Sequence, residues 1–275
     1  MYTELHAAST FSFLEAASQP EELVARAVEV GLPGVALLDK NGVYGAARFY
    51  RAAKEAGLQA IVGAEVLLDD EVRLPLLVRS QAGYRNLCRM LTSAALGRPK
   101  GEARVSWELL EEHASGLHVL SGGDDGPLAR ALQTGGKEGG RRMLDRLSSL
   151  FPGRLHVELQ RHRVREEEHR NRAALSLAES LGLPVVATNG VRYARARDKP
   201  FQDVLTCVRH KTTLDQAGQR LEAQRERCLK SPRQMSELFS DLRPALAQTA
   251  ELAAQLDFTL ADLGYRFPEY PLPPD

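Results

Sequence analysis

The sequence predicts an α/β protein, most simply a distorted, closed barrel of β-then-α units followed by a C-terminal helical extension. Short apolar runs alternate with helical patterns, and most runs are continuous, as expected for strands covered on both faces. Units of this length favour right-handed crossovers between parallel strands. The expected strands are Tyr2–His6, Gly34–Asp39, Ala60–Leu68, Leu74–Arg79, Leu117–Ser121, Leu155–Gln160 and Pro184–Asn189.

The helices between these runs have legible start and stop signals. Ser18-Gln19-Pro20-Glu21 is expected to form a capping box that starts a helix, and Gly31 is expected to end it. A second helix is expected over Tyr44–Ala56 and a third over Arg165–Leu181, each ended by a glycine.

The pattern changes after Arg197, where strand signals stop. Helices are expected near Lys199–Val208, from Ser231, and from about Pro244 to Leu256, before a Pro-rich end. The expected division is a barrel core, a helical extension that closes the domain, and a linker toward a further domain, at residues 1–197, 198–260 and 261–275.

Composition excludes several classes of protein. Of 275 residues, 36 are Lys or Arg and 36 are Asp or Glu, so no global basic field would attract nucleic acid to a free-standing domain. Cys88, Cys207 and Cys228 are few and lack metal-type spacing, which indicates a reducing compartment without disulfides. Because there is neither a membrane-span pattern nor a signal-peptide pattern, a cytoplasmic location is expected.

Polar residues stand at or just beyond the ends of several predicted strands. In such barrels these ends meet at one rim, where functional side chains gather. One histidine there is more often structural, but the shared placement of several polar groups indicates an ancestral site. The residues are His6, Asp39, Lys40, Glu65, His162, Asn189 and Gly190.

Other candidate motifs have simpler explanations. The Gly-rich segments Gly122–Gly126 and Gly135–Gly140 lack the order of residues of a phosphate-binding loop and are expected to be flexible loops. The charged segment Arg161–Arg172 is expected to be a solvated helix face.

A set of short segments carries a family resemblance. In their order and spacing, these segments resemble the PHP (polymerase and histidinol phosphatase) domain at the N-terminus of bacterial C-family DNA polymerase alpha subunits, in particular the error-prone, damage-tolerance branch. The segments are Glu4–Ser9, Phe11–Leu14, Leu37–Gly45, Gly63–Val66, Gly83–Leu87, Glu158–His162, Pro184–Tyr193, Asp203–Arg209 and Leu229–Pro232.

The resemblance implies a distorted seven-stranded barrel whose cleft would hold Zn, Mn or Fe. At the matching positions this chain keeps His6, Glu65 and His162, and has Glu15 where the family usually has an aspartate. It departs where histidines are expected, at Ala8, Lys40, Arg73 and Arg192, and where an aspartate is expected, at Gly190. The expectation is therefore a vestigial metal site, with no bound cofactor and no catalytic residue.

Three of the five departures introduce cations. We expect Lys40, Arg73 and Arg192 to replace the metal charge and to pair with Glu15, Asp39 or Glu65, because unpaired buried carboxylates are costly. Two alternatives remain: the three cations extend into solvent, or they form a cluster that grips phosphate.

The function implied by the resemblance is that of a structural and interaction module, not a nuclease, within an error-prone DNA polymerase used in damage-tolerant DNA synthesis and repair. Its partners would be the polymerase core in cis and replisome or mutasome proteins, with DNA reached through the full-length polymerase and no membrane. One alternative is an active metal-dependent phosphoesterase or 3′–5′ exonuclease, which needs a metal-activated water. Another is a stand-alone amidohydrolase-like barrel.

Overall fold

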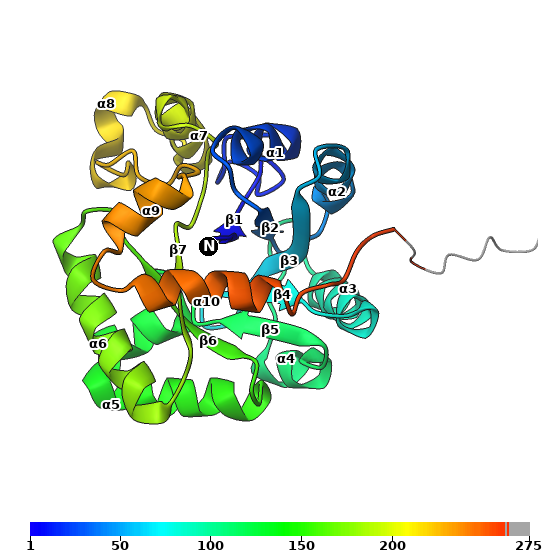
Figure 1. Cartoon of the computed structure of the whole chain (residues 1–275), viewed down its shortest axis with the longest axis vertical. Coiled ribbons are helices and arrows are strands. Elements are labelled where there is room, and N and C mark those ends of the chain that lie inside the picture. The colour runs from blue at the N-terminus through cyan, green and yellow to red at the C-terminus, as the bar shows by residue number, and fades with distance from the viewer. Residues whose placement is uncertain (262, 264–275) are drawn as a thin grey trace, which may run out of the picture.

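The computed structural model describes residues 1–261 and 263, and in it seven strands form one nearly closed barrel with helices around it (Figure 1). All seven predicted strands are confirmed. Most of the expected linker, residues 261–275, lies outside the described residues. The strands are β1 Glu4–Ala7, β2 Gly34–Lys40, β3 Gln59–Leu67, β4 Arg73–Val78, β5 Leu117–Leu120, β6 Leu155–Gln160 and β7 Val185–Thr188.

The direction of β4 corrects the prediction of an all-parallel barrel. β4 runs antiparallel to both β3 and β5, whereas the other neighbouring strands are parallel. Only residues 68–72 join β3 to β4. A parallel return needs a crossover of a dozen or more residues, so this short connection makes a hairpin.

Helices follow most strands, and those predicted from the sequence are present. The first begins at a different cap: Gln19 and Glu22 form the capping box, and the Ser18 hydroxyl instead accepts a hydrogen bond from the Ala194 amide. The helices are α1 Pro20–Glu29, α2 Ala46–Glu55, α3 Gln81–Ala95, α4 Trp107–His113, α5 Pro127–Leu150, α6 Arg165–Leu181, α7 Lys199–His210, α8 Leu214–Ala217, α9 Pro232–Leu238 and α10 Arg243–Ala253.

The expected flexible loop at Gly135–Gly140 is wrong, because α5 runs through this segment. A break in helical geometry occurs at Gly136, whose φ is 57°. Gly140 is buried, and a side chain there would collide with Leu132 and Leu177. Gly140 therefore allows α5 to pack closely against α6.

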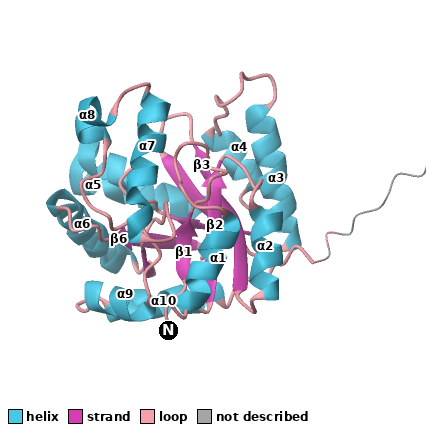
Figure 2. Cartoon of the chain, turned by 90° about the horizontal axis from the view of Figure 1, so that it is seen from above, coloured by secondary structure: helices cyan, strands magenta, loops and turns pink. Residues whose placement is uncertain are grey.

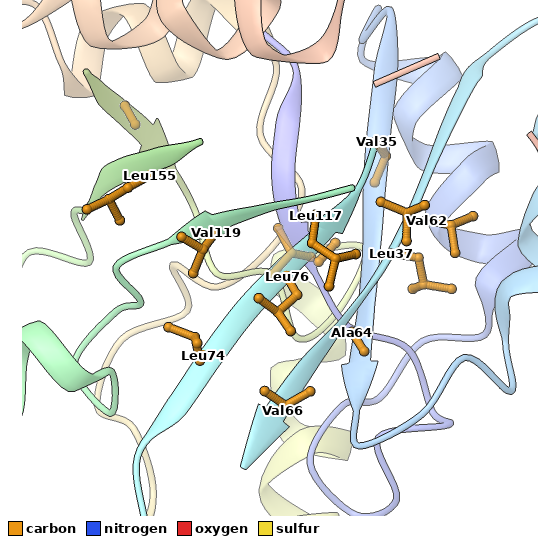
Figure 3. Close-up of a cluster of buried hydrophobic side chains, with 14 of the residues drawn as sticks. Val35, Leu37, Val62, Ala64, Val66, Leu74, Leu76, Leu117, Val119 and Leu155 are labelled. Carbon is orange, nitrogen blue, oxygen red and sulfur yellow. The ribbon is translucent and has the colours of Figure 1, made fainter. Parts of the chain in front are cut away.

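Alternate residues of the strands form two apolar layers. One layer lies between the strands and the surrounding helices and includes Val35, Leu37 and Val62 (Figure 3). The other lies inside the barrel and includes Leu5, Leu38, Ile61, Leu77, Leu120 and Val186.

The two ends of the barrel differ. Leu252, Ala253 and Leu256, within and just beyond α10, join the inner apolar layer, so α10 closes the amino end of the strands. α9 and α10 lie below the strands in Figure 2, and α7 and α8 lie higher. The carboxyl ends of the parallel strands are left to form the rim where the candidate site lies.

No described helix combines the length and apolar character needed to cross a bilayer. Cys88, Cys207 and Cys228 are free thiols.

Candidate functional site

The inward-facing positions at the carboxyl end of the barrel carry charged side chains. Lys40 ends β2 directly opposite Glu65 of β3, and Arg73 begins the antiparallel β4, so the hairpin brings Arg73 back to this rim. Because alternate residues of a strand share a face, the apolar side chains inside the barrel are followed, at its carboxyl end, by these charged side chains on the same face.

His6 lies at the centre of this cluster between two buried carboxylates. Its Nδ1 donates to Glu158 Oε1 at 2.7 Å, and its Nε2 donates to Glu65 Oε1 at 3.0 Å. Burial lowers the pKa of His6, but the charge and hydrogen bond of Glu158, together with those of Glu65, raise it to about 10. The ring is therefore an imidazolium, and neither nitrogen keeps a lone pair for a metal.

Lys40 and Arg73 close the cluster on the side of Glu15. Lys40 Nζ lies 2.5 Å from Glu15 Oε1, and Arg73 contacts Glu15 Oε2 at 2.5 Å and Glu65 Oε2 at 2.9 Å. Burial raises the pKa of both carboxyls, but the arginine charges beside them more than offset this, so both pKa values are lowered. Each carboxylate is thus compensated by protein cations.

Arg192 approaches the same carboxylate from the β7 side. Its Nη2 lies 3.5 Å from Glu65 Oε1, and only 14% of its side chain is exposed. The predicted pairing of the three cations is therefore confirmed for Glu15 and Glu65, and their extension into solvent is excluded.

Asp39 takes a separate role. It accepts hydrogen bonds from the Ser9 amide and from the hydroxyls of Ser9 and Ser12. Burial raises the pKa of Asp39 despite these bonds. This carboxyl holds the loop after β1 in place and makes no ion pair with Lys40, Arg73 or Arg192.

His162 is not brought into the cluster with the other expected ligands. Its Nδ1 bonds to Glu167 at 2.8 Å, and its Nε2 donates to the Asn189 carbonyl at 2.9 Å. Glu167 is therefore a buried partner, which corrects the expectation of a wholly solvated face over Arg161–Arg172.

Sequence reasoning missed several members of the cluster. Glu158 could have been found, because it stands two residues before Gln160 and therefore lies on the same inward face of β6. Asp125 lies in the loop before α5 and contacts Arg73 Nε at 3.1 Å. Arg227 comes from a late loop and binds Asp124, Glu222 and Gln160. No strand pattern could have revealed it.

Arg227 occupies the space beside Gly190, where the family resemblance leads us to expect an aspartate. Gly190 has a φ of 52°, which disfavours any side chain. A Cβ added there would lie 2.6 Å from Gln160 Oε1 and 2.8 Å from Arg227 Nη1. A side chain at Gly190 would therefore collide with Gln160 and Arg227. Ala8 is also enclosed, with 1% of its surface exposed.

A cleft of about 270 Å³ opens above the cluster. Its walls carry acidic and basic side chains in near-equal number. They are Glu15, Arg73, Asp124, Asp125, Arg192, Lys199, Gln202, Asp203, Thr206, Arg209, Arg220, Glu222 and Arg227.

The donor set does not fit a metal centre. Within residues 1–261 and 263, no group of three or more His, Cys, Asp or Glu side chains could hold a metal ion. His6 and His162 use both ring nitrogens in hydrogen bonds to oxygen, and Glu15 and Glu65 are bound by cations. Metal ligands must be deprotonated and free to donate, so no catalytic step through a metal can be built from these residues.

Comparisons with known proteins agree with this framework. The chain is 42% identical over 99% of its length to an error-prone DNA polymerase of Anaeromyxobacter dehalogenans, and 37% identical over 99% to one of Symbiobacterium thermophilum. The chain spans about a quarter of the length of these relatives, 24% and 26%. An amidohydrolase from Chromobacterium violaceum shares the fold, with 14% identity, a TM-score of 0.50, and coverage of 70% of this chain and 88% of that one.

The sequence profile of the PHP domain matches residues 4–162, which contain six of the seven strands and most of the charged cluster. Seven strands in a nearly closed barrel, a polar rim at their carboxyl ends and this match lead to one conclusion: the chain belongs to the PHP domain family.

Proposed function

We propose that this chain is the PHP domain of an error-prone DNA polymerase used in damage-tolerant DNA synthesis and repair. In this proposal residues 1–197 are the barrel core, residues 198–260 close it, and residues 261–275 lead toward the polymerase domains. The domain serves as a structural and interaction module and does not hydrolyse phosphoesters. Its location is cytoplasmic, in keeping with the polymerase relatives.

The single observation that carries the proposal is the set of ion pairs at the rim. Lys40, Arg73 and Arg192 stand at ligand positions of the family pattern and contact Glu15 and Glu65. Their charges do what metal ions would do for buried carboxylates, since a buried charge is tolerated when it is paired. A rim neutralised in this way stabilises the barrel without a metal.

The alternative function is that of an active metal-dependent phosphoesterase or 3′–5′ exonuclease. It would need an open coordination position and a metal-activated water as the nucleophile. His6 lies between two carboxylates, and Arg192 would repel a neighbouring cation. These contacts favour the non-hydrolytic function.

Metal analysis and an activity assay on the same preparation test the proposal. Purified protein is expected to contain no stoichiometric Zn, Mn or Fe, and to cleave neither a phosphodiester nor the 3′ end of DNA at any added Mn²⁺ concentration. The matched control is Glu65→Gln, which removes the central carboxylate charge. Tightly bound metal together with turnover abolished by Glu65→Gln would overturn the proposal, whereas trace turnover that Glu65→Gln leaves unchanged would be contamination.

The structural role has its own test in the longer polypeptide. Arg73→Ala is expected to lower the temperature at which the polymerase domains lose activity, because the barrel that supports them is weakened. The control is Arg48→Ala, since Arg48 pairs with Glu21 on the exposed surface. Equal thermal inactivation of both variants would argue against a supporting role.

A further inference from the structure

Helix α7 leaves one apolar face in solvent, formed by Phe201, Val204 and Val208. Their exposed fractions are 55%, 43% and 56%. Their spacing of three and four residues places them on one side of the helix. Eleven large apolar side chains are exposed in the described part of the chain, and no other helix there carries more than one. This α7 apolar face therefore stands out from the scattered apolar residues of an ordinary surface.

The opposite side of α7 is fixed to the barrel. Gln202 Nε2 donates to the Glu15 carbonyl at 3.1 Å, and Cys207 is buried. Gln202, Thr206 and Arg209 line the cleft described above. Because these contacts set the rotation of the helix, the apolar face cannot turn inward to bury itself.

The size of the face indicates what could cover it. With these exposed fractions, the three side chains present on the order of 300 Å² of surface. A stable complex between separate proteins buries about 800 Å² per partner. The face is therefore too small to hold a second copy of the chain by itself, but a covalently linked segment needs far less area because its effective concentration is high.

The comparisons point to such a linked segment. The PHP profile ends at residue 162, before α7, whereas the alignment with the error-prone polymerases covers 99% of the chain and so includes it. Those relatives are about four times as long as this chain, and the alignment covers 24% of their length. Helix α7 thus lies in the part of the chain that these alignments share with the long polymerases and that the PHP profile does not reach.

We propose that the α7 apolar face packs against the polymerase portion of the same polypeptide, an inference that rests on the proposed function. Lys211 is exposed just beyond the C-terminal end of α7, whereas Arg209 is paired with Glu15 at 3.3 Å on the cleft side of the helix. The partner surface is therefore apolar at its centre, with an acidic group where it meets Lys211.

Hydroxyl-radical footprinting tests this contact directly. Oxidation of the Phe201 side chain is measured in the long polymerase and in the chain of residues 1–275 alone. The expected result is a several-fold slower oxidation of Phe201 in the long polypeptide. Tyr44 is the internal control, because 71% of it is exposed, it lines a groove beside α3 that includes no residue of α7, and its oxidation should not change.

A pair of variants of the long polypeptide tests whether the protection of Phe201 depends on the α7 apolar face. Val204→Glu is expected to restore rapid oxidation of Phe201, whereas Leu96→Glu, at another exposed apolar position, leaves Phe201 protected. Equal oxidation of Phe201 in the long and short chains would overturn the proposed contact. So would a concentration-dependent dimer of residues 1–275 that Val204→Glu dissociates, since the face would then bind a second copy. Neither result bears on metal content or hydrolysis, which test the proposed function.

Discussion

At the carboxyl end of the barrel, His6 lies between Glu65 and Glu158, whereas at the amino end His118 and His156 share the inward face with Leu77 and Leu120. All three histidines are buried. The pKa of His6 is raised to about 10, and those of His118 and His156 are lowered to about 4. Burial acts alike on all three rings, so the presence or absence of a nearby carboxylate decides which of them is charged.

The amino-end pair has few polar partners. The two rings lie 5.7 Å apart, and His118 Nδ1, His118 Nε2 and His156 Nδ1 have no hydrogen-bond partner. Burial lowers both pKa values, and the neighbouring His156 lowers that of His118 further. The His118 and His156 rings are therefore neutral at neutral pH.

The carboxyl end keeps its charges because each one is paired. Glu65 contacts three cationic groups, those of His6, Arg73 and Arg192. Removing any one of them leaves the buried Glu65 carboxylate with too little positive charge around it. This difference makes the two ends vulnerable to different changes: the rim to loss of a partner, and the apolar end to protonation.

The largest effect is expected from Arg73→Ala. This change removes the cation that contacts Glu15, Glu65 and Asp125. The buried carboxylates of Glu15 and Glu65 then repel each other with less compensating positive charge between them. Breaking a buried ion pair from one side costs about 3–5 kcal/mol of unfolding free energy. Urea unfolding monitored by circular dichroism measures this loss.

Arg48→Ala is the matched control for Arg73→Ala. Arg48 lies 2.7 Å from Glu21, but both side chains are about half exposed, so the loss should stay below about 1 kcal/mol. Adding Glu65→Gln to Arg73→Ala should recover part of the stability, because it removes the unpaired charge. A loss for Arg73→Ala no larger than that of Arg48→Ala would mean that the rim network contributes little.

Acid should weaken the amino end. Because the folded pKa values of His118 and His156 are about 4, below the ordinary value of 6.5, the unfolded chain binds protons first as the pH falls. Each ring then lowers the unfolding free energy by up to about 1.4 kcal/mol per pH unit between pH 6.5 and 4.

The double variant His118→Leu/His156→Leu should lack this component of the acid dependence. The comparison must be with this variant, because burial raises the pKa of Glu4 to about 7, which changes stability in the opposite direction in the same window. Identical pH dependence of the two proteins between pH 4.5 and 6.5 would show that the pair is not held neutral.

Alkali should weaken the rim through His6. Its folded pKa of about 10 exceeds the ordinary 6.5, so its contribution is complete below pH 6.5 and is lost as the pH rises to about 10. Histidine ring signals in nuclear magnetic resonance spectra check this directly: one ring should remain protonated until a midpoint near pH 10. If every histidine titrates below pH 8, the rim does not contain a charged imidazolium.

The smallest loss of stability is expected from replacing a glycine, and Gly57 and Gly190 allow a matched comparison. Gly57 and Gly190 both have positive φ, 67° and 52°, so alanine at either site should cost about 1 kcal/mol. Nothing lies within 4 Å of the Gly57 Cβ position, whereas Gln160 and Arg227 crowd that of Gly190. Crowding should add roughly 1–2 kcal/mol to Gly190→Ala. Equal losses in thermal unfolding would mean that Arg227 moves away without cost.

Much of the barrel could be predicted from the sequence because its signals are local. Continuous apolar runs indicated all seven strands, and the glycines Gly31, Gly57 and Gly182 marked helix ends. The direction of β4 was missed because apolar periodicity carries no direction. The short connection before Arg73 was the available signal for a hairpin.

Some residues of the site could likewise be predicted from the sequence, and others could not. The positions of Lys40, Arg73 and Arg192 in the family pattern were visible in the sequence, and so was the reason for them to pair with carboxylates. Arg227 was not visible, because a loop after α8 delivers it to the barrel from far along the chain. The separation of His162 from the rim also needed the structure, since Glu167 and the Asn189 carbonyl compete for its ring.

The sequence by itself therefore determined the strand set and the fold class, because strand periodicity is a local property. Only the tertiary structure decided the charge state of His6, the space around Gly190 and the apolar face left on α7. These depend on groups that meet across the barrel from distant segments, and burial makes each group's free energy depend on all the others.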